Sequence, residues 1–193
     1  MGSPSGDQDT AGERVDVGGA EALVWGEGRY GVVLAHGIVF DAASWEPQAA
    51  RIAQEGMVAM AVEDIAPASI LGAMEYLKNE RGVEDVALLG GSAGADAILE
   101  AASRAPGSAD QLILLSPNRV VEGLGPEPKL LVASEGEPVA GASRDLALKS
   151  AGDENEVEIL PGDAHAQHIF NSDQGEPLMR LILDRLERFS AKP

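Results

Sequence analysis

The sequence predicts a single α/β domain, built as a mostly parallel sheet of about six to seven strands with helices on both faces. Short apolar runs alternate with segments of helical periodicity from Tyr30 onward, which is typical of strands joined by crossover helices. Most runs are apolar at every position, as expected for strands that are covered on both faces. The length of 193 residues suits one domain and is short for two.

Six apolar runs are the candidate strands of this sheet. An earlier segment, Val15–Trp25, alternates less clearly and is expected to form a leading edge strand. In chain order, the six runs are Gly31–Ala35, Val58–Val62, Val86–Leu89, Leu112–Leu115, Leu130–Ala133 and Val157–Leu160.

Four segments between and after these strands have helical patterns. Asp41 is placed to cap a helix over Ala43–Glu55, because its carboxylate can accept from an N–H of the first turn. Gly82 ends the next helix, as glycine commonly does. Apolar residues at helical spacing mark the other three helices at Ile70, Met74 and Leu77, at Ala95, Ile98, Leu99 and Ala102, and at Leu178, Leu181, Ile182, Leu186 and Phe189.

No segment of the chain is suited to form a second domain. Residues 1–13 are rich in Gly, Ser, Asp and Thr and are expected to be a flexible tail, so that the domain spans residues 14–193. The longest irregular stretch inside it, Pro117–Pro128, is too short to be a domain of its own.

The composition excludes several classes of function. The chain has no cysteine, which excludes disulfides, thiolate metal sites and a cysteine nucleophile. Its 32 acidic and 14 basic residues give a formal net charge of −18, and such a surface repels phosphate backbones and anionic membranes. We therefore expect neither a nucleic-acid nor a membrane partner. The acid-rich, lysine-poor composition fits a salty cytoplasm, and GC-rich coding would produce the same bias.

The expected location is the cytoplasm. No apolar run approaches the roughly 20 residues that span a bilayer, and the N-terminus lacks the basic start and apolar stretch of a secretory signal. The sequence indicates no particular oligomeric state.

The strongest chemical signal is Gly90-Gly91-Ser92-Ala93-Gly94, which follows one predicted strand and precedes a helix. This is G-x-S-x-G in the strand–turn–helix context of a nucleophilic serine. The turn is tight enough to require small neighbours, and it lifts the hydroxyl to a helix N-terminus, where N–H groups favour negative charge. A glycine-rich turn can also pack tightly or hold a phosphate. However, a dinucleotide site would have Gly at position 92, and a P-loop would have Lys after Gly.

With this motif and three others, the sequence resembles the α/β-hydrolase family, in particular small lidless esterases and dienelactone hydrolases. The other three are His36-Gly37 after the first long strand, an acidic turn after Leu130–Ala133, and a late histidine, His165. The resemblance extends over nearly the whole chain from about residue 15. It implies a catalytic triad in the chain order nucleophile, acid, histidine, with Ser92 as the nucleophile.

His165 is the expected general base. It lies in a G-x-x-H turn after the last predicted strand, from which an imidazole can take the serine proton and return it to the leaving group. His168 is the competitor three residues further on, and the resemblance favours His165. His36 is expected to shape the turn before the oxyanion hole rather than to take part in chemistry.

The acid departs from the family pattern. Members of the family usually carry E-x-D-P at this turn, and here the stretch is Glu135-Gly136-Glu137-Pro138, so Glu137 takes the position of the Asp. Glu is one methylene longer and must dock differently on the histidine, but the family tolerates it. Glu135 is the second candidate, and an acidic surface loop would contain the same residues.

The resemblance also places the oxyanion hole at the backbone N–H groups of Ala93 and Ile38. Phe40 and Trp45 either line the substrate pocket or belong to the core. Asp96, in the first turn of the helix after Ser92, is expected on the helix surface, where it would compensate the helix dipole.

These features predict a serine hydrolase that cleaves a carboxylic ester through an acyl-enzyme, with no metal and no organic cofactor. The short Pro117–Pro128 stretch leaves no room for a lid, so we expect an open site for small acyl groups, and the net charge favours neutral small-molecule esters. A thioesterase or an acyltransferase would use the same triad. A non-catalytic binding protein with this fold is a third possibility, and a flavodoxin-like phosphate binder would leave the late histidine unexplained.

Overall fold

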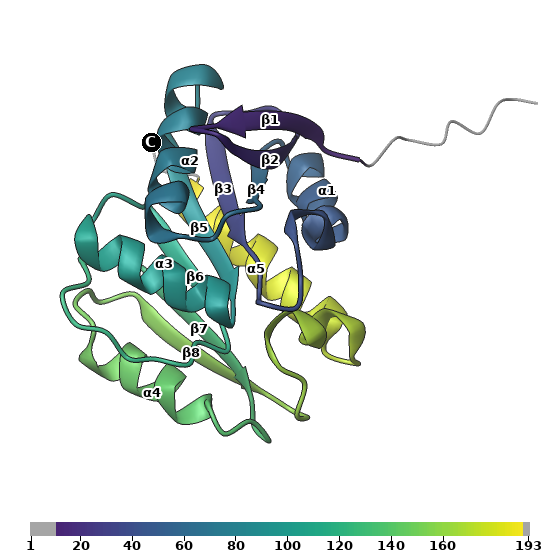
Figure 1. Cartoon of the computed structure of the whole chain (residues 1–193). Coiled ribbons are helices and arrows are strands. Elements are labelled where there is room, and N and C mark those ends of the chain that lie inside the picture. Colours follow the sequence, from purple (N-terminus) through teal and green to yellow (C-terminus); the bar gives the residue numbers. More distant parts are fainter. Residues whose placement is uncertain (1–10, 191–193) are drawn as a thin grey trace, which may run out of the picture.

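The computed structural model describes residues 11–190 and contains an eight-stranded sheet with helices on both faces (Figure 1). The strands lie in the order β1-β2-β4-β3-β5-β6-β7-β8. β2 pairs antiparallel with β1 and with β4, and all other neighbours are parallel. The predicted single-domain α/β fold with a mostly parallel sheet is confirmed.

The strands and helices have the following bounds. The strands are β1 Glu13–Val17, β2 Ala20–Trp25, β3 Tyr30–Ala35, β4 Val58–Val62, β5 Asp85–Gly91, β6 Gln111–Leu115, β7 Lys129–Ser134 and β8 Asn155–Leu160. The helices are the 3-10 helices η1 Ala42–Trp45 and η2 Ala166–Asn171, and the α-helices α1 Glu46–Gln54, α2 Pro67–Glu80, α3 Ala93–Arg104, α4 Ala140–Lys149 and α5 Gly175–Ser190.

The segment Val15–Trp25, expected as one strand, belongs to a hairpin of two. Gly18 and Gly19 have φ values of 64° and 88°, and two consecutive left-handed residues make the tight turn that joins hairpin strands. This hairpin is why the sheet has eight strands rather than six to seven. β1 begins at Glu13, so this residue belongs to the sheet and not to the predicted tail. Residues 1–10 of that tail lie outside the described residues.

Two helices differ from the sequence expectations. The segment expected as one helix over Ala43–Glu55 begins as η1, and α1 follows it. Asp41 caps η1 by accepting from the Ser44 N–H at 2.9 Å, and Pro47 stands in the first turn of α1, where no N–H is needed. The sequence analysis missed α4 altogether. Its buried residues are Ala140, Ser143 and Leu146, and only one of these is a large apolar residue.

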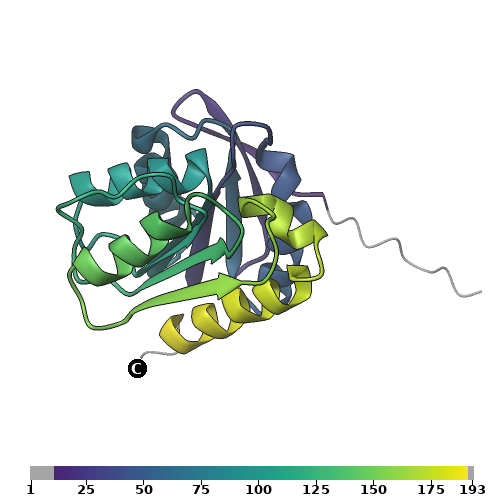
Figure 2. The same cartoon turned by 90° about the horizontal axis from the view of Figure 1, so that it is seen from below.

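The apolar strands supply two cores, one on each face of the sheet. In β3, Val33 packs with α2 and α3, whereas Val32 and Leu34 pack with α1 and α5, because successive side chains of a strand point to opposite faces. Figure 2 shows α5 on the side of the sheet opposite to α3 and α4. Within residues 11–190, no helix is both long and apolar enough to cross a membrane.

Candidate active site

Ser92 lies between β5 and α3, in a turn that only small residues can form. Its φ of 52° and ψ of −117° are strained for a residue with a side chain. Its N–H donates to the Leu115 carbonyl at 2.9 Å. A Cβ added to Gly94 would lie 2.1 Å from the Ala35 carbonyl oxygen, and one added to Gly90 would lie 2.8 Å from the Gly94 backbone. The steric reason for G-x-S-x-G therefore holds in this fold.

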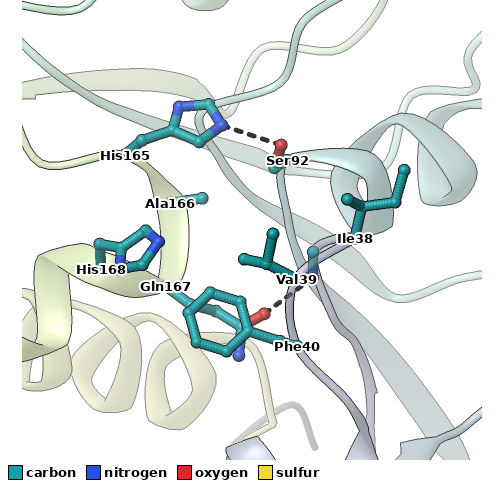
Figure 3. Close-up of a pocket in the computed structure, with 9 residues that line it drawn as sticks. Ile38, Val39, Phe40, Ser92, His165, Ala166, Gln167 and His168 are labelled. Carbon is teal, nitrogen blue, oxygen red and sulfur yellow. Dashed lines mark hydrogen bonds between the residues drawn. The ribbon is translucent and has the colours of Figure 1, made fainter.

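His165 connects this serine to a carboxylate. Its Nε2 lies 2.8 Å from Ser92 Oγ, as the dashed line in Figure 3 shows, and its Nδ1 contacts Glu137 Oε1. An ionised carboxylate only accepts hydrogen bonds, so the contact assigns the imidazole hydrogen to Nδ1 and leaves Nε2 as the acceptor of the serine hydroxyl. In this tautomer His165 can take a proton from Ser92.

The Glu137 carboxylate is buried, and both of its oxygens have partners. Only 2% of the side chain is exposed. Besides the His165 contact, Oε2 accepts from the Ser134 N–H at 2.6 Å and from the Ser116 hydroxyl at 2.9 Å. Such partners offset the cost of removing the charge from water. Glu135 is exposed. Of the two candidate acids, the structure therefore brings Glu137 to the histidine.

The other two histidines lie elsewhere. His168 is exposed, and its ring stacks at a tilt on Phe40 with centroids 5.0 Å apart. His36 is buried, and its two ring nitrogens lie 2.8 Å from the carbonyl oxygens of Gly37 and Glu63. His36 thus sits at the base of the loop that follows β3.

The loop after β3 and the first residue of α3 carry the two N–H groups expected in the oxyanion hole. In the loop after β3, the Gly37 N–H donates to Gln167 and the Phe40 N–H donates to the Gly37 carbonyl. Within residues 11–190, neither the Ile38 N–H nor the Ala93 N–H has an acceptor in the protein. Ala93 follows Ser92 in the chain, and Ile38 lines the same cavity as Ser92, so both N–H groups are available to an oxygen of a bound molecule.

A cavity of about 290 Å³ opens beside Ser92. It is mostly apolar, and Figure 3 shows the Phe40 and His168 rings together, with Val39 between them and Ser92. Ile38 and Val39 are 83% and 74% exposed. The lining residues are Gly37, Ile38, Val39, Phe40, Ser92, His165, Ala166, Gln167 and His168.

Trp45 does not line this cavity, so its alternative assignment to the core is the right one. It is fully buried and meets Phe170 edge-on at 6.0 Å between ring centroids. Trp45 ends the η1 turn, and this turn directs the side chain inward to the α1–α5 core.

The expectation that Asp96 lies on the helix surface is wrong. Asp96 is buried, and its carboxylate accepts from the Asn118 N–H at 2.8 Å, the Asn118 Nδ2 at 2.9 Å and the Arg119 N–H at 3.3 Å. Asn118 Nδ2 also lies 3.4 Å from Ser92 Oγ. Asp96 therefore holds the loop after β6 against the nucleophile, because that loop covers the first turn of α3.

Three residues other than glycine have left-handed backbone within the described part of the chain, and all three lie at this site: Ser92, Ser116 and Ala166. The Ser116 hydroxyl accepts from the Ala166 N–H at 2.9 Å and donates to Glu137. Such strain concentrates at functional sites. The sequence analysis missed Ser116, Asn118 and Gln167. For the first two, a signal existed in the polar residues that follow a buried strand at the carboxyl edge of the sheet.

Among the described residues, no group of three or more His, Asp or Glu side chains is arranged to hold a metal ion.

Three solved structures have a similar fold. A predicted CIB-like hydrolase from Thermoplasma acidophilum is 21% identical with a TM-score of 0.72, over 92% of this chain and 97% of that one. Est1E from Butyrivibrio proteoclasticus is 15% identical with a TM-score of 0.75, over 94% and 100%. An esterase/lipase from an uncultured bacterium is 16% identical with a TM-score of 0.77, over 95% and 86%.

The sequence alone gives no such match. No protein-family model matches it, and a comparison with curated proteins gives no match either. The likeness to the three solved structures is thus one of fold. The chain has the α/β-hydrolase fold, without a lid: residues 116–128, between β6 and β7, contain no helix or strand.

The Asp96 contacts predict a measurable effect on the loop after β6. Asp96→Ala removes the acceptor of three donors, so we expect faster amide hydrogen exchange at Asn118 and Arg119. The free energy of unfolding should fall by about 1–3 kcal/mol, the usual cost of leaving buried polar groups unpaired. Denaturant titration and exchange mass spectrometry measure the two effects.

The matched control is Glu100→Ala, one turn further along α3. Glu100 pairs with Arg104 at the surface, and losing such a pair changes stability by less than about 1 kcal/mol. If the two variants were equally stable and exchanged alike, the loop would be held by other contacts.

Proposed function

We propose that this protein is a serine hydrolase that cleaves small, neutral carboxylic esters through an acyl-enzyme intermediate. The observation that carries the proposal is the 2.8 Å contact between Ser92 Oγ and His165 Nε2, with a buried carboxylate on the other ring nitrogen. Packing alone does not explain a buried Glu137 carboxylate bonded to the partly exposed His165. A nucleophilic serine requires this chain of partners. The three compared proteins are a hydrolase, Est1E and an esterase/lipase, which supports the same class.

In the first half of the reaction, Ser92 Oγ attacks the ester carbonyl while His165 Nε2 takes the hydroxyl proton. Glu137 keeps the imidazole in the required tautomer and stabilises the imidazolium that forms. The carbonyl oxygen becomes negative, and the N–H groups of Ile38 and Ala93 are the donors for it. One such donor is typically worth 10²–10³ in turnover. His165 then returns its proton to the leaving alcohol, and the acyl group remains on Ser92.

In the second half, water takes the place of the alcohol. His165 accepts a proton from the water as it attacks the acyl carbonyl, the same two N–H groups hold the oxyanion, and the proton passes to Ser92 Oγ as the acid leaves. Every step uses the same three side chains and two N–H groups. Thioester hydrolysis and acyl transfer would use them too, so thioester substrates and alcohol acceptors belong in the same assay.

The cavity supports the choice of substrate. Its volume of about 290 Å³ is at the lower end of small-molecule sites. Ile38 and Val39 line it near Ser92, and Phe40 and His168 line it further from the serine. An apolar acyl or aryl group of modest size fits such walls. The formal net charge of −18 disfavours the approach of anionic esters.

Ser92→Ala and His165→Ala should each abolish hydrolysis of p-nitrophenyl acetate. Losing a triad member typically costs about 10⁴–10⁶ in turnover. The parent should also react with a fluorophosphonate probe, which modifies only an activated serine, and the Ser92 variant should not. His168→Ala is the control and should lose less than about tenfold, because it does not touch the reacting atoms. A Ser92→Ala protein that folds and keeps several per cent of the activity would disprove the assignment.

Glu137→Gln should lower turnover by at least about 10²-fold with little change in KM, because the amide cannot stabilise the imidazolium. Glu135→Gln changes the same chemistry two residues away on an exposed side chain and should stay within a few-fold of the parent. Steady-state measurements of kcat and KM for the two variants show which glutamate is the triad acid. Full activity in both would leave Ser92 and His165 acting as a dyad.

Activity on p-nitrophenyl esters should fall as the acyl chain grows beyond about four to eight carbons. A cavity without a lid cannot bury the roughly 0.8 kcal/mol per methylene that a longer chain offers. A series of esters from acetate to palmitate measures this. A preference for long chains, with activation at a lipid interface, would show that something covers the site.

A further inference from the structure

Gln167 joins the two loops that carry the candidate chemistry. Its side chain is buried, and its amide forms hydrogen bonds at both ends. Oε1 accepts from the Gly37 N–H at 2.8 Å, and Nε2 donates to the Ser44 hydroxyl at 2.9 Å. Figure 3 shows the side chain reaching from the η2 segment across to the loop after β3, below the cavity. The reaction derived above does not use this residue.

Polar contacts of the backbone hold the loop after β3 near Ser92: the Gly37 carbonyl accepts from the Phe40 N–H at 3.0 Å and lies 2.8 Å from His36 Nδ1. Ile38 and Val39 are largely exposed, so side-chain packing contributes little at the two residues that face the nucleophile. The far end of the loop is fixed by the Glu63 carboxylate, which accepts from the Ala42 N–H at 3.0 Å. At the near end, the Gly37 N–H is bonded to Gln167. Gly37 directly precedes Ile38, so this bond holds the peptide unit next to the one that carries the Ile38 N–H, and it limits how far that N–H can turn away from Ser92.

The same short segment positions His165. Between His165 and Gln167 lies Ala166, whose left-handed φ of 50° turns the chain so that both neighbours face the site. The Ala166 N–H donates to Ser116, which also holds Glu137. The segment packs closely on the strand end before Ser92, since a Cβ added to Gly91 would lie 3.3 Å from Ala166 Cβ and 3.4 Å from Gln167 Cγ. Gln167 therefore extends from a closely packed and hydrogen-bonded segment.

We infer that Gln167 is a positioning residue for the oxyanion hole, acting through Gly37 on the Ile38 N–H. This inference rests on the proposed function. Through Gln167, the general base and one oxyanion donor move as one unit, so the donor stays aimed at the carbonyl oxygen when His165 is aimed at Ser92. Donors act on the transition state only if they are held in place before the reaction, and small displacements are costly.

The test compares Gln167→Met, which keeps the size of the side chain but cannot make either bond, with two controls. Ser44→Ala removes the hydrogen bond from Gln167 Nε2 to the Ser44 hydroxyl and keeps the bond from the Gly37 N–H to Gln167 Oε1. Gln174→Met makes the same substitution in a residue that takes no part in these bonds. For Gln167→Met we expect kcat on p-nitrophenyl acetate to fall about 10–100-fold with KM within threefold. Both controls should stay within threefold of the parent in kcat.

Two further readouts separate positioning from a general loss of structure. A trifluoromethyl ketone reacts at its carbonyl carbon with Ser92 Oγ and forms an oxyanion. Its inhibition constant should rise by the same factor by which kcat falls. Amide hydrogen exchange at Gly37, whose N–H loses its acceptor, should become faster in Gln167→Met and stay unchanged in Gln174→Met. If Gln167→Met does not fold, Gln167→Asn, which withdraws the amide by one methylene and remains polar, replaces it with the same expectations.

The outcomes distinguish this inference from the proposed function. An active parent with unchanged kcat and inhibition constant in Gln167→Met would overturn the inference alone, as would a change confined to KM. A parent that neither reacts with the fluorophosphonate nor cleaves esters would overturn the proposed function. The exchange rates would still report whether Gln167 holds Gly37, and unchanged exchange in a folded Gln167→Met would refute that contact in solution.

Discussion

The parallel strands of this sheet all end at one edge, and the site depends on this constraint. β3, β5, β6 and β7 run in the same direction in adjacent register. Each is followed within a few residues by a group at the site: Ile38, Ser92, Ser116 and Glu137. Because neighbouring parallel strands lie only about 5 Å apart, residues that are distant in the sequence come close together at the carboxyl ends of these strands. β8 adds His165 from the next strand along the same edge.

A buried charge then fixes the details of this edge. The Glu137 carboxylate is removed from water and satisfied by a backbone N–H, a hydroxyl and the imidazole, because an unpaired charge in that position would be costly. The Gly136 N–H donates to the Gly162 carbonyl at 2.9 Å, which ties the acidic turn to the loop of His165. Glu is longer than the Asp of the family pattern, and the three partners show how the longer side chain is accommodated.

Backbone strain is the other cost of the arrangement. The left-handed conformations of Ser92, Ser116 and Ala166 each cost free energy that the surrounding contacts must offset. The contacts are those of the site itself: Ser116 bonds both Ala166 and Glu137, and Ser92 is bonded to the β6 end. Gln167 and Asp96 extend this set to the loops after β3 and β6. The contacts that offset this strain are thus the same contacts that hold the candidate catalytic groups.

The sequence by itself determined the six parallel strands and the elbow at Ser92, because these follow from local periodicity and steric fit, and its resemblance to the α/β-hydrolase family implied the chain order of the candidate triad. It left α4 unseen, since the buried residues of that helix include Ala140 and Ser143, and it did not indicate that Asp96 turns inward. The contact of Glu137 rather than Glu135 with His165, the place of Trp45 in the core and the bond from Gln167 to Gly37 were decided only by the tertiary structure. Each of these depends on the distance between loops that are far apart in the chain, and that distance is set by the register of the sheet, which no single segment contains.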